Sequence, residues 1–256
     1  MGCSSSKSTH PISSGLVANI EQQDWAGVVK KIKAKPGLAK EWAKIDIKGI
    51  PMECLPIHGI CDRNPPSDVL TTLLEAYPEG AMTPDHDGSI ALHYACFDRA
   101  SISVIKILIC AFPLGVRMRN KFLCLPIHLA CWRGADVETV KFLTQVYPES
   151  VKEKDMDGDL AIHDACQGLA TKEVIKFLID SYPESLRIKN NHNITAYDMA
   201  KVRRTPNAEN DIEVLQTFDR YPRYHTSGGS TVFAATGDEN TVVLTSKHGK
   251  LCSLCR

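Results

Sequence analysis

Four histidines recur along the chain at intervals of 35 residues, and a cysteine follows each of them three positions later. The pairs are His58 and Cys61, His93 and Cys96, His128 and Cys131, and His163 and Cys166. Each pair offers two possible zinc ligands on one face of a helix. Zinc needs its ligands within about 2.3 Å, however, whereas equivalent residues of stacked helices lie roughly 10 Å apart. The pattern therefore predicts structural roles: histidines that fix a turn by hydrogen bonds, and cysteines that pack as small apolar side chains.

A second arrangement with possible metal chemistry is the acidic segment Asp155-Met156-Asp157-Gly158-Asp159. It resembles the start of a calcium loop, but the later ligands are missing, including the glutamate at position 12. We interpret it as a turn, and we expect no metal ligand in the chain. The sequence also lacks a glycine-rich phosphate loop, a Gly-x-Ser-x-Gly motif and a His-Glu-x-x-His motif. We expect a non-enzymatic protein with no catalytic residue and no cofactor.

The chain ends in Cys252-Ser253-Leu254-Cys255-Arg256. A Cys-x-x-Cys pair can be redox-active or form half of a zinc site, but no second pair lies nearby. An unstructured tail is the first interpretation of residues 225–256, a palmitoylated or membrane-touching tail is the second, and a thiol-redox or zinc role is the third. Residues 231–236 and 241–246 can form a hairpin ahead of this pair.

The N-terminus carries a lipidation signal. Gly2 followed by Ser6 matches the N-myristoylation pattern, and Cys3 is an adjacent site for S-palmitoylation. The segment resembles the dually acylated N-termini of membrane-bound tyrosine kinases, although nothing downstream resembles a kinase. One myristoyl chain binds membranes only marginally, so stable anchoring needs a second signal such as the palmitate. The alternative is a disordered, serine-rich start.

Charge is distributed unevenly along a chain whose formal net charge is zero. Residues 1–50 hold eight lysines against four acidic residues, a net charge of +4. Seven of them form a cluster that either is attracted to an anionic membrane or is a solvated helix face: Lys30, Lys31, Lys33, Lys35, Lys40, Lys44 and Lys48. No transmembrane segment or secretory signal is expected. We expect a protein on the cytosolic face of a plasma membrane or endomembrane, otherwise cytoplasmic, with reduced cysteines.

The histidines and cysteines must be positioned by a repeated pair of helices. The first helix of each unit begins at the proline or alanine before the histidine, as at Pro126, because proline is tolerated in a first helical turn. The second helix has apolar residues at a spacing of about 3.6 and ends at a Tyr-Pro or Phe-Pro pair, such as Tyr147-Pro148. Asp87-Gly88 and Asp157-Gly158 mark turns between units.

The segment Leu125-Pro126-Ile127-His128-Leu129-Ala130-Cys131 resembles the ankyrin repeat, whose pattern is Thr-Pro-Leu-His followed by two alanines. The chain departs from this pattern in four ways: leucine or isoleucine replaces the threonine, cysteine replaces the second alanine, the Gly-His after the first helix is missing, and the period is 35 instead of 33. The resemblance implies an all-α ankyrin-repeat solenoid of helix-turn-helix units with short hairpin turns and flexible termini.

The repeat phase predicts the domain boundaries. Residues 1–15 are expected to be a disordered acylated segment, and residues 16–224 a single ankyrin-repeat domain. Within this domain we expect an N-terminal capping half-repeat at 16–50, with a lone helix at 25–36, and a C-terminal capping unit at 190–224, with its second helix at 211–219. Between the caps lie four repeats, at 51–85, 86–120, 121–155 and 156–189.

Ankyrin stacks usually bind protein partners on their concave side, through the turn tips and the first helices. The resemblance therefore places candidate protein-binding residues at equivalent positions of successive repeats. They are His86, Asp87, Phe97, Asp98, Lys121, Phe122, Trp132, Arg133, Met156, Asp157 and Gln167. Large aromatic side chains are typical of interface hot spots, so Phe97, Phe122 and Trp132 are either contact residues or wedges between helices.

Three functions follow from these patterns. The first is a membrane-tethered scaffold or adaptor that binds a protein partner and neither nucleic acid nor a small-molecule substrate. The second is a regulatory subunit or inhibitor of an enzyme. The third, more remote, is a thiol-redox or zinc protein that uses Cys252 and Cys255. Metal analysis of the purified protein separates the third from the others.

Overall fold

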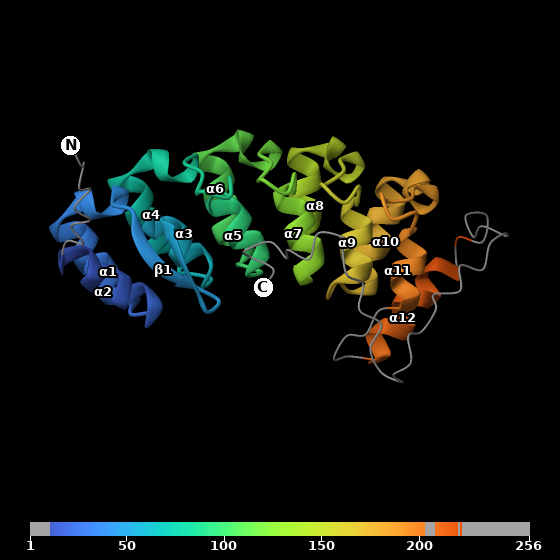
Figure 1. The fold of residues 1–256 in the computed structure, drawn as a ribbon, viewed down its shortest axis with the longest axis horizontal. Coiled ribbons are helices and arrows are strands. Elements are labelled where there is room, and N and C mark those ends of the chain that lie inside the picture. Colours follow the sequence, from blue (N-terminus) through green and yellow to red (C-terminus); the bar gives the residue numbers. More distant parts are fainter. Residues whose placement is uncertain (1–10, 203–207, 220, 222–256) are drawn as a thin grey trace, which may run out of the picture. The chain divides into compact units, whose positions relative to one another are not determined.

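The computed structural model describes residues 11–202, 208–219 and 221. Over these residues the protein is mainly helical, and its only sheet has two strands, which confirms the all-α class. The chain divides into two compact units, residues 1–115 and 116–256 (Figure 1). The predicted repeat domain 16–224 spans both units, and the boundary lies within its second repeat.

The first unit opens with a helical pair and a hairpin, followed by two further helix pairs. In chain order its elements are α1 (Pro11–Glu21), α2 (Trp25–Ala34), the 3-10 helix η1 (Pro36–Lys40), β1 (Ala43–Ile47), β2 (Ile50–Cys54), α3 (Pro56–Cys61), α4 (Ser67–Ala76), η2 (Pro78–Ala81), α5 (Ala91–Phe97) and α6 (Ile102–Ala111). A further 3-10 helix, η3 (Pro113–Arg117), begins in this unit and ends in the second.

The second unit contains three helix pairs. Its elements are α7 (Pro126–Arg133), α8 (Val137–Val146), η4 (Pro148–Lys152), α9 (Ala161–Gln167), α10 (Lys172–Ser181), η5 (Pro183–Arg187), α11 (Ala196–Val202) and α12 (Ala208–Asp219). The first helices of successive pairs pack against one another, α7 on α9 and α9 on α11, and so do the second helices α8 and α10.

The helix ends of the repeats follow the predicted signals. In each repeat the first helix begins at the proline or alanine before the histidine, and the second helix ends one residue before the aromatic-proline pair. A 3-10 helix then starts at the proline itself, because proline supplies a suitable φ and needs no N–H partner there. These short helices accommodate the extra length of the 35-residue period.

The N-terminal end of the fold differs from the sequence-based expectation. Residues 11–15, predicted to be disordered, form the first turns of α1. The antiparallel strands β1 and β2 were not predicted, and they cross the expected boundary between residues 50 and 51. The hairpin forms because Ile45 and Ile47 are buried on one face, while Lys48 and Gly49 supply the positive φ angles that its tight turn requires. At the other end, α12 begins three residues earlier than predicted.

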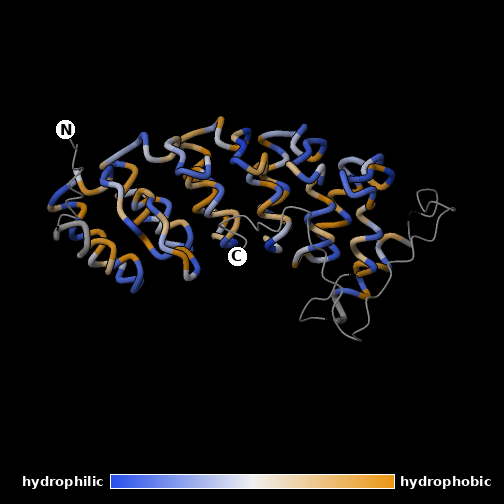
Figure 2. Tube along the Cα trace, in the orientation of Figure 1, coloured by the Kyte–Doolittle hydropathy of each residue, from blue (hydrophilic) through white to orange (hydrophobic). Residues whose placement is uncertain are grey.

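Apolar residues at helical spacing form the core of each unit. The second helices bury one face each, as α6 does with Val104, Ile105, Leu108 and Ile109. The first helices are buried more completely, and all seven residues of α5 are inaccessible. Figure 2 shows apolar residues alternating with hydrophilic ones along the helices, as expected for elements with one buried stripe. No described helix is long and apolar enough to cross a membrane.

Candidate functional site

The repeat histidines link the start of each unit to its end. His128 Nδ1 accepts a hydrogen bond from the Leu125 amide at 2.9 Å, and its Nε2 lies 3.0 Å from the Glu153 carbonyl oxygen. His58 makes the same contacts with Leu55 and Thr83, and His163 with Leu160 and Ile188. Because Nδ1 accepts a hydrogen bond, the ring proton must be on Nε2, which donates a hydrogen bond to the carbonyl oxygen. This confirms that these histidines fix turns.

Burial keeps these histidines neutral. Desolvation lowers the pKa of His58, His128 and His163 to about 4, although their backbone hydrogen bonds oppose the shift. With Nδ1 accepting and Nε2 donating, neither ring nitrogen has a lone pair available for a metal ion. The hydrogen bonds of these histidines therefore support a structural role.

The repeat cysteines are interior packing residues, as predicted. All four are buried, and none forms a disulfide with another described cysteine. Burial raises the pKa of Cys61 and Cys96 above the usual range of a thiol, so they stay protonated at neutral pH. A protonated, inaccessible thiol is a poor nucleophile and a poor metal ligand.

Each turn tip is closed by an aspartate or asparagine that accepts two backbone amides. In the second unit, Asp155 Oδ1 accepts from the amides of Asp157 and Asp159, at 3.0 and 2.8 Å. Asp85, Asn120 and Asn190 do the same in their own tips. The acidic segment at 155–159 is thus a side-chain-closed turn, as the sequence indicated, with Gly158 at a φ of +76°.

Successive tips of the second unit are joined to one another. The Met156 amide donates to the Phe122 carbonyl at 3.0 Å, and the Asn191 amide donates to the Asp157 carbonyl at 2.9 Å. The first helices are joined in a similar way, since the Leu169 amide donates to the Trp132 carbonyl at 2.9 Å. Two rows of repeat residues are therefore held at fixed spacing by backbone hydrogen bonds. The first, at the tips, consists of Phe122, Met156, Asp157 and Asn191, and the second, after the first helices, of Trp132 and Leu169. We call them the bonded rows.

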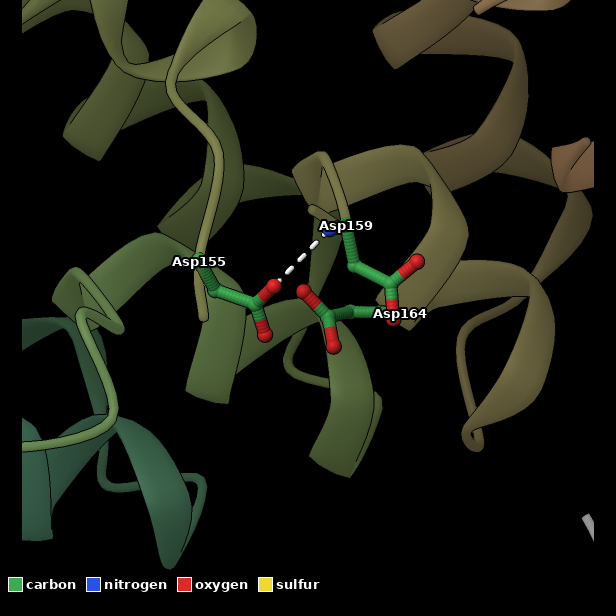
Figure 3. Close-up of side chains that lie close together, drawn as sticks. All are labelled: Asp155, Asp159 and Asp164. Atoms are coloured by element: carbon green, nitrogen blue, oxygen red, sulfur yellow. Dashed lines mark hydrogen bonds between the residues drawn. The ribbon is translucent and has the colours of Figure 1, made fainter. Parts of the chain in front are cut away.

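One tip of the second unit carries three carboxyl groups at short range. Asp155 and Asp159 from the tip and Asp164 from α9 place one oxygen each within 4.8 Å of one another (Figure 3). Asn190 Nδ2 donates to Asp159 at 2.8 Å, and the Cys124 thiol lies 3.8 Å from Asp155 Oδ2. Asp164 Oδ2 is buried and has no hydrogen-bond partner among the residues that the structure describes.

Desolvation and mutual repulsion favour protons on this carboxyl cluster. Burial raises the pKa of Asp155 to about 6 and that of Asp159 to about 7, with neighbouring carboxylates adding to both shifts. Burial first, and then the charges of Asp155 and Asp159, raise the pKa of Asp164 well above its usual range. At neutral pH these shifts favour at least one proton on the cluster, which reduces the repulsion between its carboxyl groups.

Sequence reasoning identified the tip aspartates but missed Asp164. The equivalent positions in the other units are occupied by Gly59, Tyr94, Leu129 and Met199. In the first unit, the Tyr94 hydroxyl donates to Asp85 Oδ2, the counterpart of Asp155. A charged residue at a position that is otherwise uncharged was a signal in the sequence, visible once the repeats were aligned.

The predicted binding residues differ in accessibility. Those that are exposed are His86, Lys121, Met156 and Gln167, and those that are half-buried are Asp98, Phe122, Trp132, Arg133 and Asp157. Asp87 and Phe97 are buried, with 8% and 3% of their surface exposed, and for Phe97 this favours the alternative of a side chain packed between helices. Phe97 ends the fully buried helix α5, and Asp87 lies inside the compact turn closed by Asp85.

The structure brings the half-buried aromatics together with cations. The Lys121 ammonium lies 5.0 Å from the centre of the Phe122 ring, and the Arg133 guanidinium lies 5.7 Å from that of Trp132. Of the remaining expectations, Gly2, Cys3, the hairpin at 231–246 and the Cys252–Cys255 pair lie outside the described residues.

Comparison with known proteins bears on the fold. No protein-family model and no curated protein sequence matches this chain. The chain is similar to one from the solved complex of the predatory endopeptidase Bd0816 of Bdellovibrio bacteriovorus with the immunity protein Bd3460. The two chains are 19% identical with a TM-score of 0.57, and the match covers 80% of this chain and 97% of the other. In all, 428 chains of solved structures match, so this is a widely shared fold that does not by itself assign an activity.

Proposed function

We propose that this protein is a non-catalytic protein-binding module built from ankyrin-type repeats. The observation that carries the proposal is the pair of bonded rows in the second unit, which hold Phe122, Met156 and Trp132 accessible on rigid backbone. Aromatic and methionine side chains are over-represented at interface cores, and fixed backbone reduces the entropy lost on binding. Lys121 and Arg133 beside the rings favour a partner whose contact surface is partly acidic.

The kind of partner we favour is an enzyme that the module inhibits or regulates. This preference comes from the structural neighbour, which belongs to a complex of an endopeptidase and an immunity protein. At 19% identity the likeness concerns fold alone, so the inhibitory role is our inference. A scaffold that gathers proteins without altering their activity is the second candidate, because the same surface serves both.

Membrane tethering through Gly2 and Cys3 remains part of the proposal. It rests on the Met-Gly-x-x-x-Ser pattern and the adjacent cysteine. The test is flotation of cell membranes with the wild-type protein and with Gly2→Ala, which removes the acceptor amine. Gly2→Ala should move to the soluble fraction, and equal flotation of both proteins would refute an acyl tether.

Proximity labelling in cells tests the binding surface. We expect wild-type protein to label a partner set that the double variant Phe122→Ala/Trp132→Ala loses. Ile212→Ala on α12 is the matched control, because Ile212 is an exposed apolar side chain, 57% accessible, outside both bonded rows. Identical partner sets for wild type and the double variant would refute this surface. An enzyme in the lost set should then be assayed with and without the purified protein, which separates inhibitor from scaffold.

A further inference from the structure

The lysine cluster near the N-terminus divides into bound and available members. Lys31 Nζ donates to the Gly15 carbonyl and to Asn19 Oδ1, the latter at 2.8 Å. Lys35 pairs with Glu41 at 3.6 Å, and Lys48 pairs with Asp98. These three lysines therefore serve the fold of the first unit.

Three other lysines are exposed and make no ion pair with any described residue: Lys30, Lys33 and Lys40. Lys30 and Lys33 share one face of α2, because residues three apart are neighbours on a helix, and the opposite face buries Val28 and Ile32. Lys40 ends η1, which packs against α2. We call these three residues the basic surface. Lys44 is left out because Glu53 faces it across the hairpin.

The basic surface lies close to where the N-terminal segment joins the fold. The contacts of Lys31 with Gly15 and Asn19 place the C-terminal half of α2 against the middle of α1. Pro11, the first residue of α1, lies nine residue steps after Gly2. Fully extended, they span at most about 30 Å. An acyl chain on Gly2 would therefore leave Lys30 and Lys33 within reach of the headgroups of the membrane that it enters.

We propose that the basic surface, Lys30, Lys33 and Lys40, binds the anionic headgroups of a membrane and acts together with the acyl chain at Gly2. The inference rests on the proposed acyl tether. The occupant is a lipid surface and not an acidic protein, because the surface adjoins the attachment point of the acylated segment. Each lysine near an anionic leaflet contributes about 1 kcal/mol, which corresponds to about fivefold in partition, so the three together correspond to about 100-fold.

The test uses the full-length protein, myristoylated by co-expression with an N-myristoyltransferase and checked by mass. Wild type is compared with Lys30→Gln/Lys33→Gln/Lys40→Gln in sedimentation with vesicles of phosphatidylcholine, with or without phosphatidylserine. The control is Lys106→Gln/Lys141→Gln/Lys176→Gln, which removes the same charge from exposed, equivalent positions on α6, α8 and α10. Circular dichroism confirms that every variant is folded.

On vesicles with phosphatidylserine, the basic-surface variant should bind about 100-fold more weakly than wild type, whereas the control should bind within about twofold. Raising the salt concentration should remove most of the difference, since screening shortens the reach of these charges to the Debye length. Equal binding by wild type and the basic-surface variant, or equal losses in both variants, would overturn the inference. Failure of the acyl tether has a different signature: wild type and Gly2→Ala would bind phosphatidylcholine vesicles equally.

Discussion

Replacing Asp164 with asparagine should stabilise the protein at alkaline pH. Asp164 has a buried, unpartnered oxygen and two further carboxyl groups within 4.8 Å. Two unit charges at that separation repel by about 3.5 kcal/mol at an effective dielectric constant of 20. Asparagine keeps the shape of the side chain, removes the charge and supplies an N–H donor. Since protonation already relieves part of the repulsion, we expect a gain of about 1–3 kcal/mol in the free energy of unfolding at pH 8.

The gain should depend on pH with a definite sign. The pKa of each cluster carboxyl is raised on folding, so the native state binds protons more tightly than the unfolded chain. The stabilising effect of protonation is present below the unfolded pKa, about 4, and is lost as the pH rises through the folded values of about 6 and 7 for Asp155 and Asp159. The advantage of Asp164→Asn should therefore be largest at pH 8 and small at pH 5.

Urea unfolding at both pH values, followed by circular dichroism, measures this difference. Asp157→Asn is the matched control, because Asp157 lies on the same tip with 45% of its side chain exposed. It should change stability by less than about 0.5 kcal/mol. An equal gain at pH 5 and pH 8 would refute the electrostatic reasoning. If Asp164→Asn instead destabilises, and added calcium stabilises only the wild type, the cluster is a cation site and proton sharing is the wrong description.

Four further predictions concern the repeats. His128→Ala should cost about 1–3 kcal/mol, because it leaves the Leu125 amide and the Glu153 carbonyl unpaired, whereas the exposed His86→Ala should cost almost nothing in the same urea assay. Gly168→Ala should cost at least about 1 kcal/mol, because a Cβ there overlaps the Trp132 carbonyl, and Gly37→Ala, which has open space, is its control. Phe97→Ala should lower stability by about 3–5 kcal/mol, and a surface-like effect would contradict its burial. Neutral buried histidines, with pKa values lowered from 6.5 to about 4, contribute stability that is lost as the pH falls through this window, by roughly 3 kcal/mol for each. The change in urea midpoint between pH 7 and pH 4 should therefore differ between wild type and His128→Ala, with the variant losing less stability as the pH falls.

The repeats were predictable because their signals are local. The histidine, the small residues after it and the aromatic-proline pair each act within a few positions, so the sequence predicts the helix ends closely. The β1–β2 hairpin was harder, because its strands have five residues each and pair only with each other. Its turn at Lys48 and Gly49 gives only a weak signal in the sequence.

Side-chain accessibility was the least predictable property. The repeat phase placed Phe97 and Trp132 at equivalent positions, yet the first is buried and the second is half-exposed. Helical phase fixes the direction of a side chain relative to its own helix, but burial depends on what packs there from other segments. The carboxyl cluster was missed for the same reason, because Asp164 on α9 and Asp155 on the tip lie close together only in the folded structure.

The bonded tips also have a consequence for how the second unit folds. The backbone bonds that join one tip to the next connect residues 34 apart, from Phe122 to Met156 and from Asp157 to Asn191, and each histidine closes a loop of 25 residues within its own repeat. Such contacts have short sequence separation, which favours rapid folding by growth from a formed pair of helices to its neighbour. A truncation after one repeat should thus leave the preceding repeats able to form, whereas deletion of a single residue inside a repeat breaks the spacing on which the histidine bond depends.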